Sequence, residues 1–137
     1  MRDVQVRTVS SSGLTVDAEI GKHRLRLDEP LNTPGGTDTG AEPPEVLLAA
    51  LGACEAITMR MYAARKGWAL RHAEVQLTAS NVDGVYVIRR QLTIEGDLDG
   101  GQRARLREIA NRCPVHRILT NEVRVEDVST ASVEGPR

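Results

Sequence analysis

Two cysteines, Cys54 and Cys113, are the residues of this chain whose side chains could act as redox or nucleophilic groups. Cys113 stands in the motif NRCPVHRIL, directly before Pro114, and proline is favoured in the first turn of a helix. The amide ends of such a helix, together with Arg112 and His116, would lower the pKa of the Cys113 thiol. Judged by its neighbours in the sequence, Cys113 is the better nucleophile of the two.

Cys54 lies in the middle of PPEVLLAALGACEAITMRMYAARKGW, residues 43–68, the longest apolar segment of the chain. The adjacent Glu55 would raise the pKa of the Cys54 thiol if the two side chains came close. A free cysteine is also commonly buried as a small hydrophobic residue, and this interpretation stays open for both cysteines.

A metal site is a further alternative for the same residues. Zinc would need four ligands, which Cys54, Cys113 and His116 could provide together with His23 or His72. No CxxC or HxxxH pair is present, and such pairs are typical of zinc sites. We therefore expect no bound metal.

The segment around Cys54 predicts one long helix over residues 45–66, with Pro44 near its first turn and Gly67 at its end. One face of this helix carries Leu47, Leu51, Cys54, Thr58 and Tyr62, and a small-residue face carries Ala49, Gly52, Ala53 and Ala56. A helix that is apolar on nearly every side must be covered on nearly every side, by sheets or by a second copy of the chain. Charged residues interrupt the apolar run, which is far below the roughly 20 residues of a membrane span.

The rest of the chain predicts an α+β domain with antiparallel sheets. Alternating apolar and polar residues predict strands at residues 3–9, 14–20, 22–28, 73–80, 85–96 and 122–128, with a hairpin turn of the Asp-Gly type within residues 81–84. Helical spacing predicts two further helices at residues 101–112 and 114–121. The order is βββ-α-ββ-αα-β in a single domain over residues 1–137, with residues 129–137 as a frayed polar tail.

Residues 29–44 form a long connection that contains four of the six prolines and three glycines. Segments of this length are usually lids, binding loops or disordered linkers. We expect a lid over a binding site, with a flexible linker as the alternative.

Composition argues against nucleic acid and membrane surfaces as partners. The formal net charge is −1, from 18 Lys and Arg against 19 Asp and Glu. Phe is absent and only one Trp and two Tyr are present, so the chain lacks the aromatic platform on which single-stranded nucleic acid stacks. The first residues show no charged-then-apolar leader, so we expect a cytoplasmic protein whose thiols are reduced at rest.

Three segments resemble the OsmC/Ohr family, the osmotically inducible and organic hydroperoxide resistance proteins. They are PPEVLLAALGACEAITMRMYAARKG, RRQLTIEGDL and NRCPVHRIL, and the resemblance spans residues 20–125. It implies an intertwined homodimer in which antiparallel sheets from both subunits wrap the long central helices. The chain is closer to the OsmC-like branch, because SSSG at residues 10–13 stands where the better-known branch has a turn with an arginine.

The resemblance also implies a thiol peroxidase for organic hydroperoxides with no bound cofactor. Cys54 would be the peroxidatic residue that becomes a sulfenic acid, and Cys113 the resolving residue that forms a disulfide with it. Glu45 matches a carboxylate that polarises the reactive thiol, and Leu47, Leu51 and Tyr62 would line an apolar substrate pocket. An external dithiol protein, of the lipoyl type, would reduce the disulfide.

Two points stay open at this stage. The arginine that activates the thiol is not identified, and the available cations of the N-terminal hairpins are Arg7, Arg24 and Arg26. Arg24 and Arg26 alternate with leucines and fit a solvated strand face better than a thiol site. The alternative function is a non-catalytic protein that binds a small apolar or acyl ligand in a pocket at the dimer interface, under the 29–44 loop.

Overall fold

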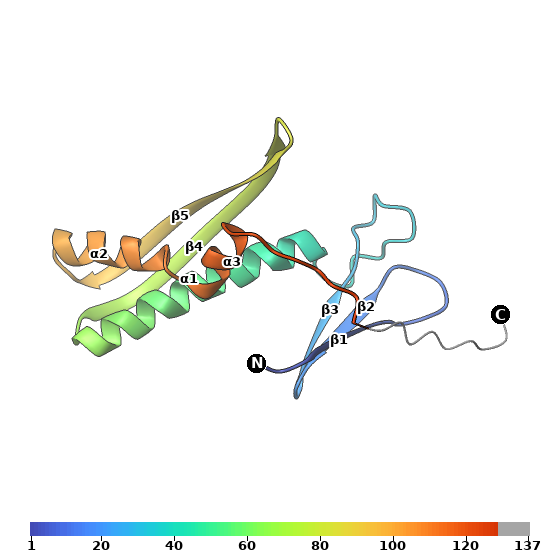
Figure 1. The fold of residues 1–137 in the computed structure, drawn as a ribbon, viewed down its shortest axis with the longest axis horizontal. Helices are drawn as coiled ribbons and strands as arrows, with labels where there is room; N and C mark the ends of the chain where they lie inside the picture. The colour runs from blue at the N-terminus through green and yellow to red at the C-terminus, as the bar shows by residue number, and fades with distance from the viewer. Residues whose placement is uncertain (129–137) are drawn as a thin grey trace.

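The computed structural model describes residues 1–128 and has the predicted α+β architecture with antiparallel sheets (Figure 1). The predicted frayed tail, residues 129–137, lies outside the described residues. In chain order the elements are β1 Val4–Thr8, β2 Val16–Ile20, β3 His23–Leu27, α1 Pro43–Lys66, β4 Ala69–Val82, β5 Val85–Asp97, α2 Gly100–Ala110 and α3 Pro114–Leu119.

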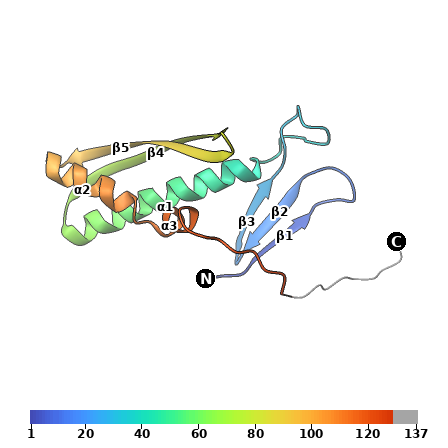
Figure 2. The same cartoon turned by 45° about the horizontal axis from the view of Figure 1, so that its top comes forward.

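The first three strands form a small antiparallel sheet with β2 in the centre. This sheet extends from the N-terminal end of α1, apart from the body that the other elements form (Figures 1 and 2). Ala18 is its only buried residue, whereas Val4, Val6 and Leu25 are exposed. Within one subunit, therefore, the apolar side chains of this sheet have almost nothing to pack against.

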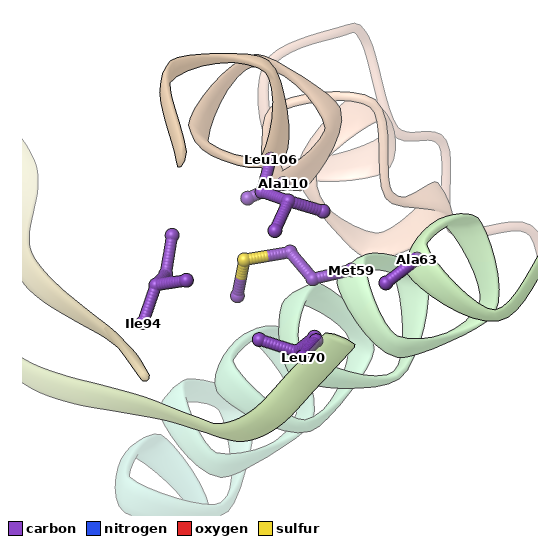
Figure 3. Packing of buried hydrophobic residues seen from close by; sticks show 6 residues of the cluster. All are labelled: Met59, Ala63, Leu70, Ile94, Leu106 and Ala110. Carbon is purple, nitrogen blue, oxygen red and sulfur yellow. The ribbon is translucent and has the colours of Figure 1, made fainter. Parts of the chain in front are cut away.

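The body of the subunit is a long β4–β5 hairpin packed with α1 and α2. Its turn is made by Asp83 and Gly84, both with positive φ (50° and 81°), as the Asp-Gly signal predicts. Figure 3 shows Met59 of α1 at the centre of the core, beside Ile94 of β5 and Leu106 of α2. This core fixes the middle of α1, where Cys54 lies, against the hairpin.

Helix α1 is covered on one side only. Gly52 is buried against β4, where a Cβ atom would come within 2.8 Å of Leu77, so this small residue permits the close approach of helix and strand. On the other side Ala53 is exposed, and Ile57 and Met61 are 58% and 67% exposed. By length and composition alone α1 could cross a membrane, but its packed side carries a buried carboxylate, Glu55, which is typical of a protein core with an ion pair.

The predicted lid, residues 29–44, is an ordered loop tied to its own base by Asp28. The Asp28 carboxylate is 2% exposed and accepts hydrogen bonds from the hydroxyls of Thr37 (2.6 Å), Thr39 (2.7 Å) and Thr15 (3.1 Å). The Thr37 and Thr39 bonds hold the pKa of Asp28 well below its usual range. In both views the loop projects from the N-terminal end of α1, away from α2 and α3 (Figures 1 and 2).

Replacement of Asp28 by alanine is expected to loosen this loop. Asp28→Ala removes the acceptor of the threonine hydroxyls and of two backbone amides, so we expect the midpoint of thermal unfolding to fall by about 5–10 °C. Calorimetry of the variant beside Asn32→Ala, a change at an exposed residue of the same loop that leaves the Asp28 hydrogen bonds intact, would measure the effect. Equal midpoints for the two variants would contradict the anchoring role of Asp28.

The predicted last strand, residues 122–128, is wrong for the isolated subunit. The segment has no strand structure and its residues are exposed, with Val125 at 94%. Its alternating valines satisfy the pattern of a strand, but no strand of the described residues pairs with it to form a ladder. Strand β4, by contrast, is longer than predicted and begins at Ala69, with an irregularity between Leu70 and His72.

Candidate functional site

The structure brings the two cysteines together where the short helix α3 meets the middle of α1. Cys113 occupies the N-cap position of α3, and its Sγ accepts a hydrogen bond of 3.2 Å from the amide of His116. The Cys54 thiol lies near enough to Cys113 to raise the pKa of the Cys113 thiol. Both are free thiols, and Cys113 is completely buried whereas Cys54 is partly exposed.

The environment of Cys113 differs from the sequence-based expectation. Burial raises the pKa of the Cys113 thiol, and the neighbouring Cys54 raises it further. The amides of His116 and Val115 lower the pKa, but the net shift is upward. The expectation that the start of α3 makes Cys113 the better nucleophile is therefore wrong, because the loss of solvent outweighs two amide dipoles. Of the two thiols, Cys54 is the one that a small molecule can reach.

A buried ion pair lies next to the thiols. Glu55 of α1 is completely buried and its carboxylate pairs with the guanidinium of Arg90 on β5. A second nitrogen of Arg90 donates to the side-chain oxygen of Asn111, at the end of α2. Burial lowers the pKa of Arg90, and the charge of a Cys113 thiolate opposes this effect. Arg90 is thus a cation that connects Glu55, α2 and the thiol site.

Sequence analysis missed Arg90, although a signal for it exists. Arg90 lies on the same face of β5 as Ile88, Leu92 and Ile94, so it occupies an inward-facing position of the strand. An arginine in an apolar row, and a glutamate in the middle of an apolar helix, each require a buried partner of opposite charge.

A cavity of about 220 Å³ opens beside this pair. Its wall includes Leu51, Arg90 and His116, with further apolar contributions from Ile88 and Leu119. Burial and the charge of Arg90 both lower the pKa of His116, so the imidazole is neutral near neutral pH. The cavity therefore combines apolar walls, one half-buried cation and one neutral imidazole.

The titration of His116 tests this arrangement. We expect its midpoint, followed by NMR of the imidazole proton, to lie below the ordinary value of about 6.5. The pKa of His116 is lower in the folded state than in the unfolded state. The stability that His116 contributes is therefore fully present above the unfolded pKa and is lost as pH falls through the folded pKa. In Arg90→Met the midpoint should move up towards the ordinary value, and an unchanged midpoint would contradict the electrostatic contact.

Comparison with known proteins settles the family. Residues 36–126 match the sequence profile of the family described as OsmC-like protein. The chain belongs to the OsmC family. No curated protein sequence matches it significantly.

Several solved structures share the fold of this OsmC chain. An OsmC-like protein from Mycoplasma pneumoniae is 23% identical with a TM-score of 0.71, and the match covers 87% of this chain and 86% of that one. An organic hydroperoxide resistance protein from Legionella pneumophila is 18% identical with a TM-score of 0.62, covering 86% and 89%. The organic hydroperoxide resistance protein of Bacillus subtilis is 20% identical with a TM-score of 0.59, covering 85% and 88%.

The predicted pocket residues of this OsmC chain do not meet in one cavity within a subunit. Leu51 lines the cavity beside Arg90, whereas Leu47 lines an open hollow with Pro43 and Pro44, and Tyr62 lies in a third cavity between α1 and α2.

Glu45 caps the start of α1 and does not lie beside the cysteines. Its carboxylate accepts a hydrogen bond of 2.8 Å from the amide of Glu42, as one half of a capping box at the start of α1. The carboxylate next to the cysteines is Glu55.

The arginines of the N-terminal hairpins make surface contacts, as the solvated-face interpretation predicts. Arg24 pairs with Glu19 at 3.1 Å and Arg26 with Asp17 at 2.8 Å, across neighbouring strands, and Arg7 donates to the side chain of Gln5. For the metal alternative, residues 1–128 of the OsmC chain contain no group of three or more His, Cys, Asp or Glu side chains placed to hold an ion.

Proposed function

We propose that this protein is a thiol peroxidase that reduces organic hydroperoxides through a Cys54 sulfenic acid and a Cys54–Cys113 disulfide. The observation that carries the proposal is the pairing of a partly exposed thiol, Cys54, with a fully buried one, Cys113, beside a half-buried arginine, Arg90. Family membership supports a role with peroxides, since several structures of this fold are named organic hydroperoxide resistance proteins.

In the first step the Cys54 thiolate attacks the terminal oxygen of the hydroperoxide. The S–O bond forms while the O–O bond breaks, so the sulfur is oxidised by two electrons to a sulfenic acid and the peroxide is reduced to an alcohol. The alkoxide leaving group takes up one proton. The apolar walls of the neighbouring cavity, which include Leu51, Ile88 and Leu119, favour an organic substituent over the hydrogen of hydrogen peroxide.

In the second step Cys113 attacks the sulfur of the Cys54 sulfenic acid. The S–S bond forms, the S–O bond breaks, and the departing hydroxide leaves as water with the proton of the Cys113 thiol. Burial disfavours the Cys113 thiolate that this attack requires, and the positive charge of Arg90 favours it. We assign to Arg90 the positioning role of supporting ionisation of the resolving thiol.

A dithiol protein, of the lipoyl type, would then return both cysteines to thiols and become a disulfide itself. Such a cycle suits the reducing cytoplasm, where we place the protein.

The active form is proposed to be a homodimer. The uncovered side of α1, with Ala53, Ile57 and Met61, and the unsupported N-terminal sheet are the apolar surfaces that a second copy would cover. Light scattering coupled to gel filtration would then give twice the 14.9 kDa mass of the chain. The Ile57→Glu variant would have the mass of a single chain. A monomeric wild-type protein would rule out the dimer.

The peroxidase is tested by stoichiometric oxidation of the reduced protein with cumene hydroperoxide. Wild type should lose both free thiols and gain no oxygen by mass, since the product is an intramolecular disulfide. Cys113→Ser should stop at a sulfenic acid, which dimedone traps, and Cys54→Ser should not react. If both thiols of the wild type survive an excess of hydroperoxide, the protein is not a peroxidase and the ligand-binding alternative replaces it.

A further inference from the structure

A cavity of about 590 Å³ lies between α1 and α2 and is distinct from the one beside Arg90. Its apolar wall includes Ile109 and Pro114. A volume of this size is within the range of sites for small organic molecules. The mechanism proposed above makes no use of it.

Four cationic side chains converge on this cavity from two elements. Arg65 and Lys66 belong to the last turn of α1, and Arg105 and Arg112 come from α2 and the turn after it. Cations in a last turn complement the helix dipole, which accounts for the first two but not for the convergence of the others. The charge balance of the chain is −1, so this cluster reflects placement and not composition.

The cluster is centred on the ring of Tyr62. Arg65, Lys66 and Arg105 lie 5.4, 5.6 and 5.6 Å from the ring centroid. Glu108 neutralises only one of the four cations, by its ion pair of 2.9 Å with Arg105. Within residues 1–128 the charges of Arg65, Lys66 and Arg112 have no carboxylate within ion-pair distance.

The phenol of Tyr62 adds a directional group to the cluster. Its oxygen accepts a hydrogen bond of 3.1 Å from Nε of Arg105, which leaves the phenolic proton available to an acceptor in the cavity. That hydrogen bond and, to a smaller extent, the charges of the surrounding cations lower the pKa of Tyr62. An anion placed here would gain charge-assisted hydrogen bonds from arginine and tyrosine together.

We propose that this cavity binds an organic anion with an apolar body. Its carboxylate or phosphate would lie at Tyr62 and the four cations, and its body along Ile109 and Pro114. The site does not require peroxidase activity. Carboxylate and phosphate heads share the recognising chemistry, and the experiment separates them.

Trp68 provides a direct readout, because it is the single tryptophan of the chain and its ring lies edge-on to Tyr62 with centroids 5.5 Å apart. Octanoate, octyl phosphate and octanol would be titrated into the full-length reduced protein while the tryptophan fluorescence is recorded. We expect saturable binding of at least one anion about tenfold tighter than octanol, weakened by added salt. Tighter binding of one anion identifies the preferred head group.

The double variant Arg65→Gln/Arg112→Gln should weaken binding of that anion about tenfold and leave octanol unaffected. Arg107→Gln is the matched control, since it removes a charge from α2 outside the cavity wall. Equal affinities for the anions and octanol, absence of saturable binding, or a double variant that binds the anion as wild type does would each overturn the proposal. Failure of the peroxide reaction would leave this binding unchanged, so the two proposals fail separately.

Discussion

Arg90→Met is expected to lower the free energy of unfolding by about 3–5 kcal/mol, the largest effect of any substitution considered for this protein. The variant leaves the carboxylate of Glu55, which is completely buried, without its counter-charge. It also removes the donor to Asn111 and so loosens the contact between β5 and the end of α2. Urea unfolding, with the slopes compared as well as the midpoints, would measure the loss.

The size of this effect depends on the unpaired charge, which a second substitution can remove. Glu55→Leu combined with Arg90→Met should be about 2 kcal/mol more stable than Arg90→Met alone, because two apolar side chains then replace the pair. Arg89→Met is the matched control on the same strand, since Arg89 is exposed and donates to the hydroxyl of Ser80. If the variants at positions 89 and 90 unfold at the same urea concentration, the ion pair does not hold this site together.

The two thiols are expected to react with iodoacetamide at very different rates. Near neutral pH, Cys54 should be alkylated more than about 30-fold faster than Cys113, because exposure of a fully buried side chain requires a local opening of about 2 kcal/mol or more. The raised pKa of Cys113 widens the difference by reducing its thiolate fraction. Mass spectrometry of peptides from a time course of the wild-type protein would give both rates.

Single-cysteine variants separate burial from charge in this result. In Cys54→Ser the charge that opposes ionisation of Cys113 is gone, so alkylation of Cys113 should begin at lower pH than in the wild type while remaining slow. In Arg90→Met it should begin at higher pH, because the favourable cation is lost. Comparable rates for the two cysteines of the wild type would refute the assignment of Cys54 as the accessible thiol.

Local patterns in the sequence predict most of the fold. The strict alternation in LTVDAEI predicts β2, the apolar run after Pro44 predicts α1, and Asp83–Gly84 predicts the hairpin turn. These features succeed because each depends on residues within one or two turns of chain. The segment of residues 122–128 fails the same test, since its strand pattern cannot supply the neighbouring strand that a ladder needs.

The candidate site was predictable only in part, because local patterns in the sequence do not determine contacts between distant segments. The motifs identify Cys54 and Cys113, but whether α3 buries Cys113 depends on how three elements pack, and this burial reverses the expected direction of its pKa. The partnership of Glu55 with Arg90 joins the middle of a helix to a strand 35 positions later, and no local rule connects them. The apolar neighbours of Glu55 and of Arg90 indicate that each side chain faces the core. They do not indicate that the two side chains pair with each other.

The nearly coreless N-terminal sheet has a consequence for how this protein gains and loses structure. A three-stranded sheet that buries only Ala18 has little free energy of its own to resist opening. In a lone subunit the backbone amides of β1, β2 and β3 should therefore exchange with deuterium well before those of β4 and β5. Where a second copy covers the sheet, that exchange becomes dependent on protein concentration, and dilution should release the first 27 residues while the hairpin and α1 stay folded.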